Sequence, residues 1–142
     1  MMRVLLADDQ ARVRSALRLL LEQLPEVEVL GEAVDATGLL DWLKAAHPDL
    51  VLLDWELPGL PTADPLRHLR DHWPGLLVVA LSSQPGVRQA ALDAGADAFV
   101  SKGDPPERLL AAVQHCCYKW AKTVHLTRAK TPQMPGASRP PS

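Results

Sequence analysis

A short stretch near the N-terminus decides the fold, and it reads Arg3-Val4-Leu5-Leu6-Ala7-Asp8-Asp9. The run from Val4 to Ala7 is apolar throughout, as expected for a strand that is buried on both faces of a sheet. Two carboxylates follow directly, where such a strand would end. Because open α/β sheets gather their functional groups at the carboxyl ends of parallel strands, the stretch predicts a buried parallel strand that leads into an acidic site.

Four further strand-like runs alternate with stretches whose apolar residues recur at helical spacing. The runs cover residues 27–30, 50–53, 76–81 and 98–101. Right-handed crossovers join such units into one parallel sheet with helices on both faces. We therefore predict an α/β fold of the (βα)5 type, a flavodoxin-like doubly wound parallel sheet with strand order 2-1-3-4-5. That order places the first and third strands side by side, with their loops adjoining.

Polar residues and prolines mark the expected starts of the helices. Asp35 is expected to cap the second helix. Thr62 or Asp64 is expected to cap the third, because Pro65 is tolerated only in a first helical turn. Asp104 precedes two prolines and is expected to cap the last helix.

Composition and charge exclude several classes of protein. The chain has 142 residues, enough for one domain with a proper core, and its net charge of -2 gives no reason to expect non-specific nucleic-acid binding. No apolar run approaches the roughly 20 residues that a membrane span needs, and no signal peptide is visible. The two cysteines, Cys116 and Cys117, are neighbours, which disfavours a disulfide and indicates a reducing, cytoplasmic setting.

The helical pattern of the last element fails near Lys122, and the residues at the end of the chain are rich in proline. We expect a single domain over residues 1–121. Residues 122–142 are expected to form a Pro-rich disordered tail or a truncated linker.

With the predicted strand order, three carboxylates meet at one edge of the sheet. Asp8 and Asp9 follow the first strand, and Asp54 ends the third. Carboxylates this close repel one another unless a cation joins them. Mg²⁺ takes oxygen ligands and usually binds one or two carboxylates together with phosphate oxygens. The cluster therefore predicts a magnesium site.

The same edge predicts a phosphoryl acceptor. A carboxylate at a strand end, such as Asp54, can attack a phosphoryl group and form an acyl phosphate. Lys102 would neutralise one phosphoryl oxygen, and the hydroxyl of Ser82 would donate to another. Each residue alone has an ordinary explanation: the Asp pair could cap the next helix, and Asp54 could be a turn residue. The specific signal is their conjunction at the ends of four strands.

Several short motifs lie around these residues: Asp8-Asp9, Asp54 with Leu57-Pro58, Leu81-Ser82, Ala94-Gly95-Ala96, and Phe99 three residues before Lys102. On these motifs, roughly residues 2–118 resemble the receiver domain of two-component response regulators. The segment 99–113 is similar to the NarL/LuxR branch of that family. The resemblance implies that Asp54 is the phosphoacceptor and that a histidine kinase supplies the phosphoryl group.

The resemblance also implies roles for the neighbouring residues. Asp9 would bind Mg²⁺ directly, Asp8 would bind it through water, and the backbone carbonyl of Glu56 would be a further ligand. Ser82 and Phe99 would form a switch pair of hydroxyl and aromatic ring. They would act on the face of the fourth helix, fifth strand and fifth helix, which is then the expected partner or homodimer surface.

The chain departs from the family pattern in the loop after Asp54. The family usually has Asp-Gly where this chain has Pro61 and Thr62, and Pro65 falls inside what is often helix. We therefore expect a stiffer loop and a later third helix. The NarL/LuxR branch normally continues into a helix-turn-helix domain, for which this sequence shows no equivalent, so we expect no DNA binding by this chain alone.

Three functions remain open from the sequence. The first is a phosphorylation-switched signalling domain that is not an enzyme, because its only chemistry is self-directed phosphotransfer and autodephosphorylation. The second is a Mg²⁺-dependent aspartyl-phosphate phosphatase or phosphotransferase with Asp54 as nucleophile. Enzymes of the haloacid-dehalogenase type need a second Asp two residues on, and here that position holds Glu56. The third is an interaction module that works without phosphorylation, a pseudo-receiver.

Overall fold

The computed structural model describes residues 1–130 and contains five parallel strands. They are β1 (Met2–Ala7), β2 (Val27–Ala33), β3 (Leu50–Asp54), β4 (Leu77–Ser82) and β5 (Ala98–Ser101). The strands form a single sheet in the order β2-β1-β3-β4-β5. The predicted strand order is therefore confirmed, with β1 and β3 as neighbours.

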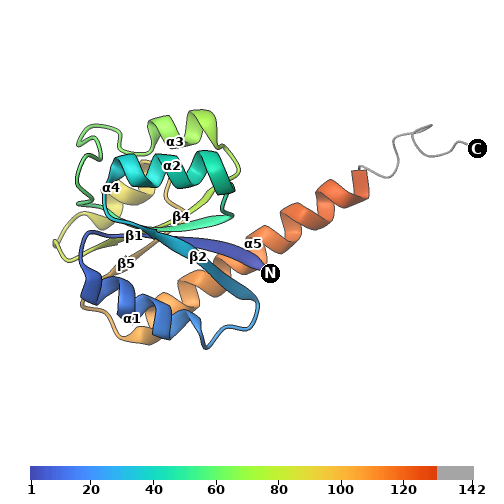
Figure 1. Cartoon of the computed structure of the whole chain (residues 1–142), viewed down its shortest axis with the longest axis horizontal. Coiled ribbons are helices and arrows are strands. Elements are labelled where there is room, and N and C mark those ends of the chain that lie inside the picture. The colour runs from blue at the N-terminus through green and yellow to red at the C-terminus, as the bar shows by residue number, and fades with distance from the viewer. Residues whose placement is uncertain (131–142) are drawn as a thin grey trace, which may run out of the picture.

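Five helices alternate with the strands and form the two outer layers (Figure 1). They are α1 (Ala11–Leu21), α2 (Ala36–Ala46), α3 (Arg67–His72), α4 (Arg88–Asp93) and α5 (Pro106–Lys130). Helices α1 and α5 cover one face of the sheet, and α2, α3 and α4 cover the other. This is the predicted three-layer, doubly wound α/β fold.

The central strands are buried on both faces, which explains their unbroken apolar sequence. In β1, Val4 and Leu6 pack with α1 and α5, whereas Leu5 and Ala7 pack with α2 and α3. All four are fully buried. Successive side chains of a strand point to opposite faces, so a strand between two helical layers needs apolar residues at every position.

The outer strand β2 runs further than expected, to Ala33 instead of Leu30. Its pairing with β1 shifts register between Val4 and Leu5. At Gly31 the ring of Trp42 lies so close that a Cβ would meet it at 2.3 Å. The indole Nε1 of Trp42 also donates to the backbone carbonyl of Glu32, which follows Gly31, at 3.1 Å. The glycine that interrupts the apolar pattern therefore belongs to the strand and makes room for Trp42.

The predicted helix caps are confirmed in one case and wrong in two. Asp35 accepts a hydrogen bond from the amide of Gly38 at 2.8 Å, as a capping residue should. Helix α3 begins only at Arg67, later than a cap at Thr62 or Asp64 requires, because the turn at Pro65 delays it. Asp104 accepts from the amide of Ser101 at 3.0 Å and so closes the loop before α5 instead of capping it.

Helix α5 continues to Lys130, past Lys122 where the tail was expected to begin. The remaining expectation of a Pro-rich tail falls on residues 131–142, which lie outside the described residues. Among the helices of residues 1–130, none combines the length and the apolar character that a membrane crossing requires.

Candidate functional site

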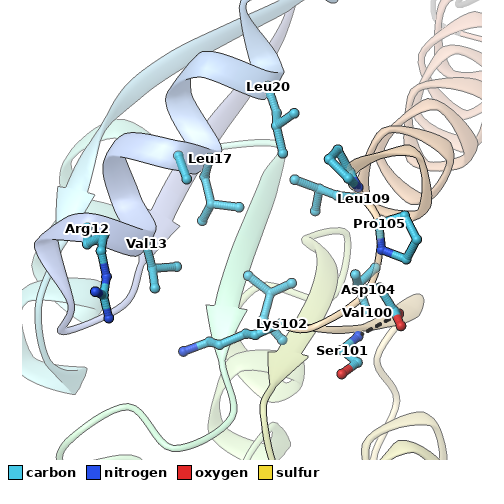
Figure 2. A pocket seen from close by; sticks show the side chains of 13 residues that line it. Arg12, Val13, Leu17, Leu20, Val100, Ser101, Lys102, Asp104, Pro105 and Leu109 are labelled. Atoms are coloured by element: carbon cyan, nitrogen blue, oxygen red, sulfur yellow. Dashed lines mark hydrogen bonds between the residues drawn. The ribbon is translucent and has the colours of Figure 1, made fainter.

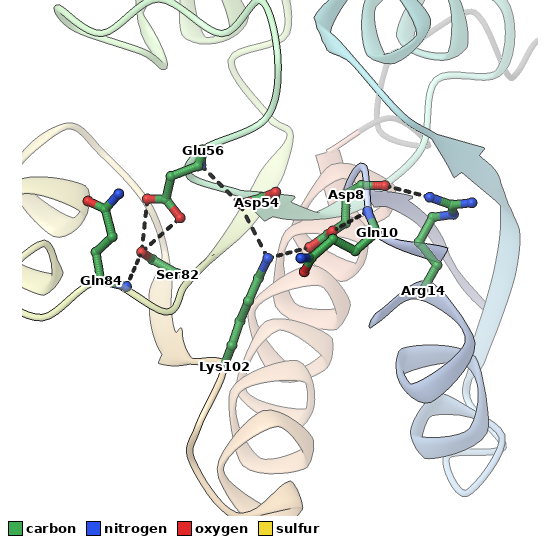
Figure 3. A network of polar contacts seen from close by, with 8 residues as sticks. All are labelled: Asp8, Gln10, Arg14, Asp54, Glu56, Ser82, Gln84 and Lys102. Carbon is green, nitrogen blue, oxygen red and sulfur yellow. Dashed lines mark hydrogen bonds and ion pairs between the residues drawn. The ribbon is translucent and has the colours of Figure 1, made fainter. Parts of the chain in front are cut away.

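The carboxyl ends of β1, β3, β4 and β5 meet at one edge of the sheet and bring the predicted site residues together (Figure 3). Asp8, Asp9 and Asp54 each place one carboxylate oxygen within 4.8 Å of the others. Asp8 and Asp54 are buried, whereas Asp9 is exposed. The structure therefore confirms the predicted clustering of the three carboxylates, with one of them open to solvent.

Lys102 reaches into this cluster from the end of β5. Its Nζ lies 2.7 Å from Asp8 Oδ2 and 3.4 Å from Asp54 Oδ1. Partial burial alone would lower the pKa of the ammonium group. The hydrogen bond with Asp8 and the charges of Asp54 and Asp8 outweigh burial and raise the pKa. Lys102 is therefore a fixed positive charge between two buried carboxylates.

One lysine does not compensate three carboxylates. Burial raises the pKa of Asp54, and the negative charges of Asp8 and Glu56 raise it further. Two groups oppose this rise: the amide of Glu56, which donates to Asp54 Oδ1 at 2.9 Å, and the charge of Lys102. Asp8 Oδ2 is buried and, among residues 1–130, finds no polar partner other than the ammonium group of Lys102. The site therefore has spare oxygen ligands and spare negative charge, which fits a hard divalent cation.

The backbone of Asp8 is fixed by a contact that the sequence analysis missed. Arg14 on α1 donates to the carbonyl oxygen of Asp8 at 2.9 Å and pairs with Glu32 of β2 at 2.5 Å. Asp8 Oδ1 also accepts from the amide of Gln10 at 2.8 Å. Helix α1 has no side-chain cap, so the alternative interpretation of the Asp pair as a helix cap is wrong. Arg14, a basic residue on the helix that follows the Asp pair, was the sequence signal of this support.

Ser82 is fully buried at the end of β4, and its hydroxyl is held from two sides. It donates to the carboxylate of Glu56, with Oε1 at 3.0 Å and Oε2 at 2.9 Å. It also accepts from the amide of Gln84 at 3.0 Å. The sequence analysis assigned Glu56 only a backbone role, so this side-chain contact is new.

Two aromatic residues lie around the site. Trp55 is half-buried in the turn after β3 and lines a surface cavity together with Glu56 and Gln84. Trp55 therefore lies at the rim of the site, next to Asp54 in the sequence. Phe99 is half-buried on β5, with the guanidinium carbon of Arg88 5.9 Å from its ring centroid. The Phe99 ring therefore lies beside α4, where a change of its orientation would alter that surface.

Sequence comparison places this arrangement among known proteins. The model of the response regulator receiver domain family matches residues 4–114. The nitrate/nitrite response regulator protein NarL of Escherichia coli (strain K12) is 31% identical over 138 residues, which cover 96% of this chain and 62% of NarL. The transcriptional regulatory protein DesR of Bacillus subtilis (strain 168) is 28% identical over 114 residues, which cover 80% of this chain and 57% of DesR. The chain thus spans between half and two thirds of these relatives.

Solved structures agree with the sequence matches. The isolated receiver domain of RcsB from Salmonella enterica serovar Typhimurium, solved with the phosphomimetic BeF3⁻, superposes with a TM-score of 0.71 at 30% identity, over 80% of this chain and 88% of that one. A LuxR-family two-component response regulator from Aurantimonas sp. SI85-9A1 gives a TM-score of 0.73 at 28% identity, over 90% of this chain and 98% of that one. The chain therefore belongs to the response regulator receiver domain family, on its NarL/LuxR branch.

Proposed function

We propose that this domain receives a phosphoryl group on Asp54 from a histidine kinase and signals through the resulting change of conformation. The observation that carries the proposal is the pair of buried carboxylates, Asp8 and Asp54, held around Lys102 at the sheet edge with Asp9 beside them. The domain is then a phosphoacceptor and not an enzyme, because its chemistry changes only itself.

The transfer is a displacement at phosphorus. A carboxylate oxygen of Asp54 forms a new bond to phosphorus, the bond from phosphorus to the donor's imidazole nitrogen breaks, and its electron pair stays on that nitrogen. Lys102 stands ready to neutralise an oxygen of the group in transfer, because its ammonium already lies 3.4 Å from Asp54. Positioning and charge compensation account for most of the catalysis in such reactions.

The cation of this site is proposed to be Mg²⁺. Asp9 would bind it directly, Asp54 would be a second carboxylate ligand, Asp8 would act through water, and the backbone carbonyl of Glu56 would complete the protein ligands. Bound Mg²⁺ would neutralise negative charge on these carboxylates and on the phosphoryl oxygens. The exposure of Asp9 supports this assignment, because the ion must enter from solvent.

A cavity between α1 and the start of α5 supports docking of the kinase (Figure 2). Its volume is about 290 Å³, and its lining includes the apolar side chains of Val13, Leu17, Leu20 and Leu109. Lys102 also lines it, so the cavity adjoins the site. An amphipathic helix that carries the phosphohistidine could place apolar side chains here while it presents the phosphoryl group to Asp54.

The output surface is proposed to be the face of α4, β5 and α5, where two copies of the chain or another partner would associate. RcsB, a structural relative, has been solved as dimers bound to DNA. DNA binding by this chain alone is not part of the proposal. The proposal does include a cytoplasmic setting, which the free thiols of Cys116 and Cys117 support.

Mass spectrometry after incubation with acetyl phosphate and Mg²⁺ tests the assignment. The wild-type chain should gain one phosphoryl group, and Asp54→Asn should gain none. Asp93→Asn, on the exposed side of α4, is the matched control and should behave as wild type. An equal mass gain in Asp54→Asn would refute the assignment. Rapid consumption of the donor with little accumulation of phosphorylated protein would favour the phosphatase alternative, and no reaction at all would favour the pseudo-receiver.

A further inference from the structure

The hydroxyl of Ser82 has a single proton to donate, and in this structure it donates that proton in a hydrogen bond to the carboxylate of Glu56. A serine hydroxyl offers one donor and two acceptor lone pairs. Both carboxylate oxygens of Glu56 lie within 3.0 Å of Ser82 Oγ, and the amide of Gln84 occupies one lone pair. Ser82 can therefore donate to a phosphoryl oxygen on Asp54 only after its hydrogen bond to Glu56 is broken (Figure 3).

Glu56 connects the phosphoacceptor and the switch hydroxyl through two different groups. Its backbone amide donates to Asp54 Oδ1 at 2.9 Å, and its side chain accepts from Ser82. Ser82 is fully buried on a strand, whereas Glu56 lies in an exposed turn. When the two separate, the Glu56 side chain is the one that has room to move into solvent.

We propose that Glu56 is a positioning residue that holds the Ser82 hydroxyl away from Asp54 until the charge of a phosphoryl group displaces it. The inference rests on the proposed function and adds a regulatory step to it. A phosphoryl group brings close to two negative charges next to a carboxylate that is already negative. Repulsion favours the departure of the Glu56 side chain, and the same phosphoryl oxygens offer Ser82 a new charged acceptor.

The proposal predicts how substitutions of Glu56 change the binding of beryllofluoride, a phosphoryl mimic, in the presence of Mg²⁺. Glu56→Ala leaves no hydrogen bond to break, so the affinity measured by isothermal titration calorimetry should rise about tenfold. Glu56→Gln keeps a neutral acceptor for Ser82, and hydrogen bonds to neutral acceptors are weaker, so its affinity should fall between wild type and Glu56→Ala. Both substitutions leave the backbone groups of residue 56 in place.

The same titrations in a Ser82→Ala background separate this mechanism from simple repulsion. If Glu56 acts through the Ser82 hydroxyl, the gain from Glu56→Ala should largely disappear in that background. Ser82→Thr restores a hydroxyl and should restore most of the gain, which also controls for a loss of stability in Ser82→Ala. Repulsion alone would give Glu56→Gln and Glu56→Ala equal gains that persist without the hydroxyl, and this result would overturn the proposal.

The controls distinguish a failure of this inference from a failure of the proposed function. Asp54→Asn should abolish beryllofluoride binding in every background. If the wild type does not bind beryllofluoride, or if Asp54→Asn binds it equally well, the phosphoacceptor assignment itself is wrong. If the wild type binds it but the Glu56 variants do not depend on Ser82, only the positioning role of Glu56 is overturned.

Discussion

At the scale of single residues, the site is organised by an imbalance of charge. Lys102 lies closer to Asp8 than to Asp54, so Asp54 has the weaker interaction with this partly buried ammonium group. Burial and the charge of Asp8 raise the pKa of Asp54. Asp9, exposed beside them, is the carboxylate that an incoming cation meets first. Under the proposed function these facts suit the three acids to separate tasks: Asp8 would fix the lysine, Asp54 would accept the phosphoryl group, and Asp9 would recruit the ion.

We expect Asp9→Asn to weaken Mg²⁺ binding by on the order of 10- to 100-fold, because the exposed negative charge that attracts the ion is lost. Trp55 is half-buried next to the acceptor, so its fluorescence should report the titration. Trp55→Phe is the control for the signal and should remove most of it. Unchanged Mg²⁺ affinity in Asp9→Asn would contradict the metal assignment.

The residues that the sequence could predict are those whose position follows from the strand pattern. Asp8, Asp54 and Lys102 each follow an apolar run, and parallel strands bring such ends together whatever the loops do. The side chain of Glu56 could not be placed in the same way. It reaches Ser82 because of the turn after β3, in which the amide of Glu56 bonds Asp54, and the sequence does not show that geometry.

At the scale of elements, a second ionic cluster ties helices to the opposite edge of the sheet. Asp97, just before β5, accepts from Arg70 of α3 at 3.1 Å and from Lys119 of α5 at 2.6 Å. It also accepts from the amide of Val78 at 2.8 Å. One carboxylate therefore joins the two helical layers to the start of two strands, far along the strands from the site.

Asp97→Asn should destabilise the fold by about 1 kcal/mol, because it leaves two partly exposed basic side chains without their half-buried charged partner. Burial alone would raise the pKa of Asp97, but the hydrogen bonds from Lys119 and Val78 and the two basic charges outweigh it and lower the pKa. A carboxylate whose pKa is lower in the folded state than in the unfolded state stabilises the fold at pH values above its unfolded-state pKa. That contribution is lost as the pH falls from the unfolded value of 3.8 through the folded one.

Urea unfolding of both proteins, at neutral pH and at acid pH, measures this contribution. The difference in unfolding free energy between wild type and Asp97→Asn should be largest at neutral pH and should shrink in acid. Asp93→Asn, at an exposed position of α4, should unfold as wild type does. A difference that stays constant down to pH values below the folded-state pKa would show that packing, and not the charge, accounts for the loss.

The bounds of a helix or strand could be predicted where one side chain fixes the local backbone. They were harder to predict where an unusual backbone conformation or a tertiary contact decides them. Asp35 caps α2 as expected, because an Asp next to free helix amides satisfies one of them. At α3 the same logic failed, since Asp64 takes a left-handed conformation with a φ of 51° and the chain needs a further turn before the helix begins. The length of the outer strand β2 was underestimated because Gly31 has a low strand propensity. The structure requires a glycine there because the ring of Trp42 leaves no room for a side chain.

At the scale of the whole molecule, the site edge and the face of α4, β5 and α5 are linked through β4 and β5. Ser82 pairs with Ser101 at the site end of these strands, and Phe99 pairs with Ala80 along the same ladder. A hydroxyl that moves toward Asp54 would therefore act on the strand that carries Phe99. Such a change is a shift of population between two packings of the ring, biased by contacts of the phosphoryl group.

The coupling predicts how activation changes self-association. Beryllofluoride with Mg²⁺ should change the molar mass that light scattering measures for the wild type, because reorientation of Phe99 alters the apolar area of the output face. Ser82→Ala should still bind beryllofluoride but should show a smaller change of mass, since the hydroxyl that links the site to the ring is gone. Phe99→Ala should alter association in both states.

Leu19→Ala, which changes an exposed apolar residue on α1, serves as the matched control and should behave as wild type. An equal response in wild type and Ser82→Ala would show that the signal reaches the surface by another route, and an equal response in Phe99→Ala would exclude the ring as its carrier.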